Sequence, residues 1–317
     1  MRAAVIAKPL AAELRDNTIP DPAAGEIRVK VEGCGVCGSN IPVWEGRPWF
    51  NYPLQPGSPG HEGWGIVDAV GPEVNAFTIG ERVGFLSEHA YAEYDVAPVT
   101  AALRLPAILN SIPFPAEPLG CAMNVFRRCA IQPGERVAII GIGFLGALLT
   151  RLAAAADARV FAISRSAFAL EIAASFGAER VERLRDYAQV HEAVLNWSNQ
   201  RGCDCVIEVV GKQEPLDLAT ELTKERGRLV IAGYHQDGTR QVNMQLWNWR
   251  GLDVINAHER DPEVYLRGMQ AAVDAVISGV LDPSPLYTHV FPLERISEAF
   301  DMATHRREGF LKALVTP

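Results

Sequence analysis

Two patterns of apolar residues divide the 317-residue chain into parts. In the first hundred residues, short β-favouring runs are separated by clusters of Pro and Gly, which predicts strands joined by turns. We expect these strands at Ala3–Ala7, Glu26–Glu32, Gly65–Val70 and Tyr91–Val96. The first part of the chain is therefore predicted to be β-rich.

From about residue 135 the pattern changes to short apolar strands that alternate with helical segments. Such alternation predicts parallel βαβ units and a doubly wound sheet. The expected strands are Arg136–Ile140, Arg159–Ile163, Cys205–Val209 and Arg228–Ala232, and the expected helices include Leu145–Ala156 and Ala167–Phe176. A mixed tail follows, with helices at Pro262–Ser278 and Glu294–Ala303 and extended segments at Tyr287–Phe291 and Leu311–Val315.

Composition narrows the functional classes. Lys and Arg number 30 and Asp and Glu 38, a formal net charge of −8 without a basic cluster, which argues against nucleic acid as a partner. Six cysteines are too few for a disulfide scaffold and indicate a reducing compartment. The apolar stretch before Lys8 has only five residues, which is too short for a signal peptide. The apolar segment Val137–Ala156 is about as long as a membrane span, but glycines and Arg151 interrupt it. We therefore expect a cytoplasmic protein with no membrane partner.

A glycine-rich segment is the first candidate binding site. Gly141-Ile142-Gly143-Phe144-Leu145-Gly146 fits G-x-G-x-x-G, between a predicted strand and a predicted helix. In this motif the glycines allow a tight turn, close approach of the backbone to a pyrophosphate, and close packing of helix on strand. The helix N-terminus then faces the phosphates. We expect Gly141, Gly143, Phe144, Leu145 and Gly146 to bind a dinucleotide; the alternative is a glycine-rich turn of a parallel sheet.

The end of the next strand bears on the type of coenzyme. An acid at this point would bind the ribose of NAD(H), but the chain has Ser164-Arg165-Ser166. Hydroxyls and a guanidinium can bind a 2′-phosphate, which a carboxylate would repel. This favours NADP(H) over NAD(H). In the alternative interpretation, Arg165 is a solvated loop residue and an acid elsewhere serves NAD(H).

Candidate metal ligands lie in the β-rich part. His61 and Glu62 stand in the segment Gly60-His61-Glu62-Gly63-Trp64-Gly65, and Cys37 lies 24 residues before His61. A thiolate and an imidazole are suitable zinc ligands, and their wide spacing suits a catalytic site assembled by tertiary structure. Such a site has three protein ligands and one open position for water or substrate.

In these motifs the chain resembles the zinc-containing medium-chain dehydrogenase/reductase (alcohol dehydrogenase-like) family, and within it the polyol (sorbitol) dehydrogenase-like branch. The resemblance extends over nearly the whole length and includes the Cys37 and His61 motifs, the glycine loop, Gly80-Glu81-Arg82-Val83, Glu117-Pro118-Leu119-Gly120 and Pro285–Leu293. It implies a GroES-like β-rich catalytic domain in residues 1–118, a Rossmann coenzyme domain in 119–257, and a return segment, 258–317, that completes the catalytic domain.

The resemblance also implies residue roles. Zinc would be held by Cys37, His61 and Glu117, with Glu62 among the ligands or just outside them; Cys121 is the competing third ligand. Zinc would act as a Lewis acid in reversible hydride transfer between an alcohol, expected to be secondary, and NADP(H). Ser39 would pass the hydroxyl proton outward. The remaining residues expected to border the coenzyme are Gly211 and Gly233.

The chain departs from the family pattern at three places. The cysteine lobe that often holds a structural zinc is missing after Arg82-Val83, so we expect one zinc per chain. Asn40 replaces the usual Asp, which typically accepts a hydrogen bond from the ligand histidine; an Asn carbonyl keeps the geometry but not the charge. Pro42 stands where a histidine often lies, so a proton relay must leave Ser39 by another route.

The sequence also bears on the substrate, on the oligomeric state and on competing functions. The aromatic loop Trp44–Phe50 is expected to form a pocket wall or, alternatively, to pack at a surface or hinge. The apolar strand Leu229–Ala232 and the segment Trp247–Trp249 indicate a homodimer, with a tetramer as the alternative. The competing functions are a zinc-independent NADPH quinone or enone reductase and a non-catalytic NADPH-binding protein. The presence of Cys37, His61 and Glu117 together argues against the binding protein.

Overall fold

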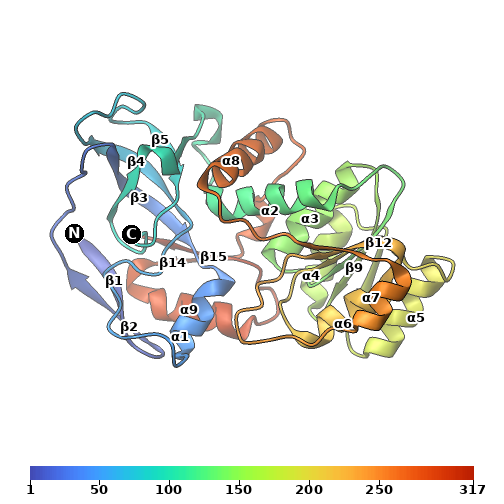
Figure 1. Ribbon diagram of the computed structural model, residues 1–317. Helices are drawn as coiled ribbons and strands as arrows, with labels where there is room; N and C mark the ends of the chain where they lie inside the picture. Colours follow the sequence, from blue (N-terminus) through green and yellow to red (C-terminus); the bar gives the residue numbers. More distant parts are fainter. The chain divides into compact units, whose positions relative to one another are not determined.

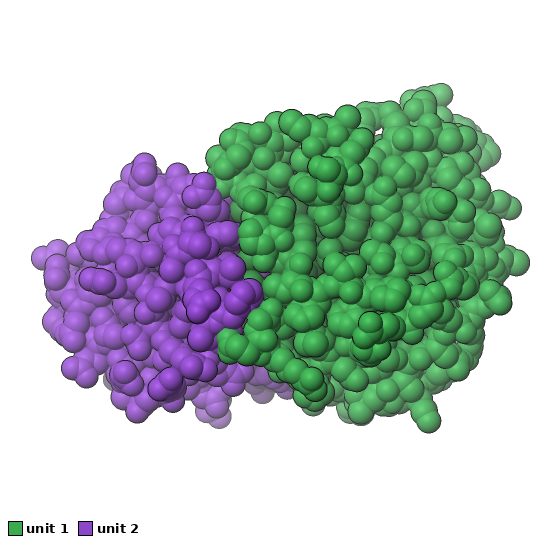
Figure 2. All heavy atoms as spheres, turned by 180° about the vertical axis from the view of Figure 1, so that it is seen from behind, with its two compact units in different colours: residues 1–120, 261–317 green, residues 121–260 purple.

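The computed structural model describes residues 1–317, which form two compact units (Figure 2). Unit 1 contains Met1–Gly120 and Asp261–Pro317, and unit 2 contains Cys121–Arg260. The domain boundaries given above, at residues 118 and 257, stay a prediction.

Unit 1 is built on a mostly antiparallel sheet that contains three of the four strands predicted in the first hundred residues; the fourth, Ala3–Ala7, lies in a separate hairpin. In sheet order its strands are β14 (His289–Pro292), β15 (Ala313–Thr316), β3 (Glu26–Gly35), β4 (Gly63–Val70), β5 (Arg82–Phe85) and β7 (Ala102–Arg104), and β6 (Tyr94–Pro98) also pairs with β3. A separate hairpin pairs β1 (Arg2–Lys8) with β2 (Ala11–Asp16). Along β3, buried Ile27, Val29 and Val31 alternate with more exposed residues, so one face of the sheet covers the core.

Short helices and three longer ones complete unit 1. The short ones are η1 (Gly38–Asn40), α1 (Ile41–Glu45), η2 (Val99–Ala101), η3 (Ala107–Leu109), η4 (Ser284–Leu286) and η5 (Leu293–Arg295). The longer ones are α2 (Ala116–Cys129), which continues into unit 2, α8 (Pro262–Ile277) and α9 (Ile296–His305).

Helix α2 was not expected from the sequence, because it contains Pro118 and Gly120. Pro118 lies in the first turn, where a missing N–H costs no intrahelical hydrogen bond. A Cβ on Gly120 would lie 2.7 Å from the backbone nitrogen of Met269 in α8. The glycine is therefore needed for close helix packing.

Unit 2 confirms the predicted doubly wound parallel sheet (Figure 1). In sheet order its strands are β10 (Arg180–Arg183), β9 (Arg159–Ser164), β8 (Arg136–Ile140), β11 (Cys203–Glu208), β12 (Thr223–Ile231) and β13 (Asp253–Asn256). The helices are α3 (Phe144–Ala155), α4 (Ala167–Ser175), α5 (Tyr187–Trp197), α6 (Gln213–Leu222) and α7 (Met244–Arg250). Helix α3 packs on α4, and α5 packs on α6.

The strand order places a topological switch point between β8 and β11, because β8 leads to β9 on one side and β11 leads to β12 on the other. In open parallel sheets, ligands bind beyond the carboxyl ends of the strands at such a point. The glycine segment follows β8 directly, so it lies at this position.

The cysteines are not part of a covalent framework. All six are free, and Cys34, Cys203 and Cys205 are buried core residues. None of the helices combines the length and the apolar character that crossing a bilayer requires.

Candidate metal centre and coenzyme site

The loop after β3 presents Cys37 through its own hydrogen bonds. Cys37 is the N-cap of η1, and its Sγ accepts the Ser39 N–H at 3.5 Å. The backbone N–H of Cys37 donates to Asn40 Oδ1 at 3.2 Å, and the Tyr91 hydroxyl donates to the same oxygen at 2.8 Å. The thiol is half-buried, whereas Cys34, three residues earlier, is buried in the core. The chain therefore presents only the second cysteine of the Cys34–Cys37 pair.

The hydrogen bond that orients His61 goes to the Pro59 carbonyl, not to the Asn40 side-chain oxygen expected from the sequence. The Nδ1 of His61 lies 3.0 Å from the Pro59 carbonyl, and the Asn40 side-chain amide donates to the same carbonyl at 3.2 Å. Because a carbonyl only accepts, Nδ1 carries a proton, which leaves Nε2 for a cation. Asn40 thus supports the histidine through the Pro59 carbonyl rather than through its own oxygen. An Asp at position 40 could not make this donation.

The candidate ligands form a compact group. One donor atom each from Cys37, His61 and Glu62 lies within 4.8 Å of the other two. Burial lowers the pKa of the His61 imidazole, but the negative charges of Cys37, Glu117 and Glu62 outweigh it and raise the pKa to about 10. The site therefore favours added positive charge. Sulfur, imidazole and carboxylate donors are the set that zinc prefers, so the residues fit this metal.

A buried ion pair holds Glu62. The Nζ of Lys312 lies 2.6 Å from Glu62 Oε1 and 2.5 Å from Oε2, and the two side chains are 5% and 1% exposed. Oε2 receives no well-directed hydrogen bond despite the short distance. A Cβ on Gly35 would lie 1.8 Å from this oxygen, so position 35 must be glycine for the carboxylate to fit.

Sequence reasoning missed Lys312, which precedes β15 and is 250 residues from Glu62. The residues around Lys312 in the sequence do not indicate that its ammonium group pairs with an acid. The only cue is that a lysine in an apolar C-terminal strand segment is rarely buried without an anion.

Glu117 belongs to unit 1 and lies in the first turn of α2. It acts on the pKa of His61 and of Lys312 as a nearby negative charge, although it is not in the group of three donors within 4.8 Å. Cys121, the competing ligand, falls in unit 2. Ser39 is partly buried in η1, two residues from Cys37.

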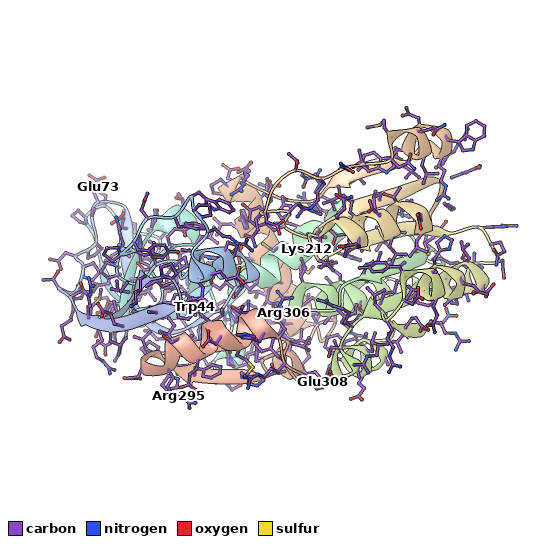
Figure 3. The ribbon with its side chains drawn as sticks, turned by 90° about the horizontal axis from the view of Figure 1, so that it is seen from below. Trp44, Glu73, Lys212, Arg295, Arg306 and Glu308 are labelled. Carbon is purple, nitrogen blue, oxygen red and sulfur yellow. The ribbon has the colours of Figure 1, made fainter.

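The aromatic loop is not a pocket wall at Trp44. The Trp44 side chain of α1 (labelled in Figure 3) is fully buried. It stacks on Phe300 of α9 with ring centroids 5.0 Å apart, and its indole N–H donates to Asp301 at 3.1 Å. This indole is a core residue that joins α1 to α9. Trp49 is 56% exposed, so only the later part of the loop is available to a ligand.

The glycine segment of unit 2 has the geometry of its motif. Gly141 has φ +101°, a conformation that favours glycine, and a Cβ there would lie 2.5 Å from Val210. A Cβ on Gly146 would lie 2.1 Å from the Gly141 carbonyl oxygen. Gly143 is the N-cap of α3, and no side chain caps this helix, whose first residues are Phe144 and Leu145. No capping side chain thus occupies the N-terminus of α3, and a helix N-terminus of this kind suits a phosphate group.

Two arginines, Arg165 and Arg183, lie at the turn that follows β9. Ser166 caps α4 by accepting the Ala169 N–H at 3.2 Å, and the Ser164 hydroxyl accepts the Ser166 N–H at 3.3 Å. Arg165 is exposed between them. Arg183, at the end of β10, donates from Nε to the Arg165 carbonyl at 2.9 Å. The sequence did not indicate Arg183, because the pairing of β10 with β9 brings it to this turn.

The backbone groups of Gly211 and Gly233 are already used. Glu208, fully buried at the end of β11, accepts the Gly211 N–H at 2.7 Å and His235 Nε2 at 3.0 Å. Its carbonyl accepts the Gly233 N–H at 2.8 Å. Arg240 donates to the carbonyl of Gly211 at 3.0 Å. These glycines can border a coenzyme only by close packing, not by offering N–H groups.

Comparison with known proteins agrees with this geometry. Residues 23–107 match the alcohol dehydrogenase GroES-like domain, and residues 145–277 match the zinc-binding dehydrogenase domain. A curated relative is the sorbitol dehydrogenase of Bacillus subtilis strain 168, 25% identical over 100% of this chain and 97% of that protein.

Two solved structures illustrate the coenzymes found with this fold. One is described as a zinc-binding dehydrogenase from Sinorhizobium meliloti 1021 bound to NADP, with 25% identity, a TM-score of 0.85 and coverage of 100% and 99% of the two chains. The other is an alcohol dehydrogenase from Escherichia coli CFT073 with NADH, with 22% identity, a TM-score of 0.85 and the same coverage.

The first domain match lies within unit 1, which holds the candidate metal centre, and the second lies mainly in unit 2, which holds the glycine segment. With full-length relatives that oxidise or reduce alcohols, they establish the class of reaction as well as the fold. The chain is an oxidoreductase and belongs to the zinc-type medium-chain dehydrogenase/reductase family.

Proposed function

We propose that the chain transfers a hydride reversibly between a secondary alcohol and NADP(H), with a single zinc per chain. The observation that carries the proposal is that donor atoms of Cys37 and His61 lie within 4.8 Å of one another, in a site where the charges of Glu62 and of nearby Glu117 favour a cation. When bound, zinc supplies a Lewis acid that stabilises alkoxide character on the substrate oxygen.

Cys37, His61 and Glu117 hold the metal in this proposal, and Glu62 stays outside, paired with Lys312. The charges support this division, because a zinc dication with Cys37 and Glu117 is neutral, and so is the Glu62–Lys312 pair. If Glu62 were a ligand as well, Lys312 would remain as a buried charge with a weakened partner. The Pro59 carbonyl orients the His61 imidazole so that Nε2 is the nitrogen offered to the metal.

Ser39 is the proposed carrier of the hydroxyl proton. It stands two residues after Cys37 in η1, and the structure shows no protein partner for its hydroxyl, which is therefore available to accept a proton and pass it outward.

The preference for NADP(H) rests on the turn after β9. Ser164, Arg165 and Ser166 form this turn without an acid, and Arg183 is tied to it through the Arg165 carbonyl. Two guanidiniums near one turn suit a 2′-phosphate, and the α3 N-terminus suits the pyrophosphate.

Two further features complete the proposal. Six free cysteines support a cytoplasmic location. Strand β13 is the outer strand of its sheet, and Trp249 on the preceding α7 is 83% exposed, which supports association of two copies through this edge.

Elemental analysis of the purified, unchelated protein tests the metal part. About one zinc per chain supports the proposal, and near zero after metal-replete purification points instead to a zinc-independent quinone or enone reductase.

Coenzyme titration tests the NADP(H) part. Arg165→Gln is expected to weaken NADPH binding by roughly tenfold to a hundredfold and to leave NADH binding nearly unchanged, since it removes a charge-assisted hydrogen bond. Arg180→Gln, at the other end of β10, is the matched control. An equal loss for both coenzymes would contradict the assignment of Arg165 to the 2′-phosphate.

A further inference from the structure

A polar depression lies in unit 2, away from the glycine segment. It has a volume of about 370 Å³, and its lining includes Arg136, Arg201, Asp204 and Lys224. Arg136 is the first residue of β8, Arg201 lies two residues before β11, and Lys224 is the second residue of β12. The glycine segment follows the opposite end of β8, about 16 Å away for a strand of five residues.

The acids of this depression are already matched. Asp204 pairs with Lys224 and accepts the backbone N–H of Arg136 at 2.8 Å. Glu135 pairs with Arg228 and accepts the Gln132 N–H at 2.9 Å. Neither acid forms an ion pair with the side chain of Arg136 or Arg201. Apart from these pairs, the depression keeps two positive charges, those of Arg136 and Arg201.

The two remaining guanidiniums lack acceptors. Arg136 Nε is buried without a hydrogen-bond partner. The side chain of Arg201 is exposed at the rim and makes no hydrogen bond or ion pair with the chain. A buried donor without an acceptor is costly, and in a native fold it points to a ligand or ion that completes it.

We infer that this depression binds a phosphate group, either free phosphate or a small phosphate monoester, between Arg136 and Arg201. Two guanidinium forks match the geometry and the double negative charge of phosphate. The inference concerns a site separate from the metal and coenzyme sites, and it does not depend on the proposed redox function.

Calorimetric titration of the full-length protein with inorganic phosphate tests the inference. Saturating NADP⁺ is present throughout, so that phosphate cannot report on the coenzyme site, and ionic strength is held constant with chloride. We expect saturable binding of one phosphate per chain. Arg136→Met and Arg201→Gln should each weaken it at least tenfold, whereas Arg180→Gln, which changes an exposed cation of the same unit, should not.

A parallel titration with glycerol phosphate separates the two sources of the group. Binding of the monoester at least as tight as that of phosphate identifies a phosphorylated small molecule, and tighter binding of inorganic phosphate identifies the free ion. Absence of saturable heat, or equal binding by wild type and by Arg201→Gln, would overturn the inference. Arg201 is exposed, so its variant answers the question even if Arg136→Met does not fold.

Thermal melting in phosphate-free buffer gives an independent readout. Arg136→Met removes an unsatisfied buried donor, so its melting temperature should equal or exceed that of wild type, and phosphate should no longer raise it. A lower melting temperature without phosphate, together with an unchanged phosphate response, would assign Arg136 a structural role and overturn the inference.

Discussion

The candidate metal centre and the coenzyme site are built in contrasting ways. The coenzyme site is nearly continuous in sequence, because Gly141, Gly146 and the turn Ser164–Ser166 all belong to one βαβ unit. The metal centre joins Cys37, His61 and Glu62 to Lys312, which is 250 residues from Glu62. One site depends on local backbone geometry, and the other on charges brought together by the tertiary fold.

This contrast indicates that the two sites fail for different reasons. A Cβ at Gly146 or Gly141 meets backbone or side-chain atoms at 2.1 to 2.5 Å, so steric exclusion governs the coenzyme site. In the metal centre the decisive quantities are the ligand atoms and the balance of buried charge. Each site should therefore be breakable without loss of the other.

The largest effect is expected from Cys37→Ser. It replaces the thiolate with a poor zinc ligand, so zinc per chain should fall from about one towards zero. The turnover of alcohol should fall by more than about a thousandfold, as loss of several kcal/mol of Lewis-acid stabilisation requires. Zinc analysis and steady-state kinetics measure both quantities. Cys34→Ala, three residues away in the core, should keep its zinc, and NADPH affinity should be normal in both variants.

Lys312→Met should cost about 3–5 kcal/mol of unfolding free energy, because it leaves Glu62 as a buried charge without its partner. Urea denaturation measures the loss. Lys312→Arg keeps the charge and should recover much of the stability. The double variant Lys312→Met with Glu62→Gln removes both charges and should be more stable than Lys312→Met alone. Equal stability of the single and double variants would show that the pair is not the cause.

Gly146→Ala should raise the NADPH dissociation constant by roughly tenfold to a hundredfold, equivalent to about 1.4–2.8 kcal/mol. The added Cβ would meet the Gly141 carbonyl at 2.1 Å, which forces α3 away from β8 and displaces its N-terminus. Fluorescence titration with NADPH checks this. Zinc content should stay at the wild-type value, and its loss would mean that the two sites are not separable.

The smallest effect is expected from Asn40→Asp, which converts the residue to the one usual in the family. It removes the donation to the Pro59 carbonyl and sets a carboxylate 3.2 Å from that oxygen, so His61 should be held less well. We expect zinc affinity about tenfold weaker, as for other residues that orient metal ligands. Competition with a chelator measures it. Tighter zinc binding would show instead that a carboxylate at position 40 can reach the imidazole.

Local patterns predicted much of this molecule. The parallel sheet of unit 2 and the glycine turn were evident because their signals lie within a few residues of one another. Strand β2 and strand β10 were missed because their residues are largely exposed and carry no apolar alternation.

The errors at the sites have one physical origin. Lys312, Arg183 and the Pro59 carbonyl act through partners that only strand pairing or chain return supplies. The Trp44 indole was placed in a pocket because an aromatic loop gives no sign of whether it packs inward. Its contact with Phe300 depends on the C-terminal helix, which the loop sequence cannot reveal.

The fit of the Glu62 carboxylate against Gly35 constrains how this sequence can change with time. Any larger residue at position 35 is excluded while the Glu62 carboxylate keeps its place. Replacing Glu62 in turn would destabilise the fold, because Lys312 would remain as a buried charge without a partner. Substitutions at the three positions must therefore occur in a permitted order: Lys312 is neutralised before Glu62 is replaced, and Glu62 is replaced by a shorter residue before Gly35 gains a side chain. Among descendants of this protein, the three positions are expected to vary together or not at all.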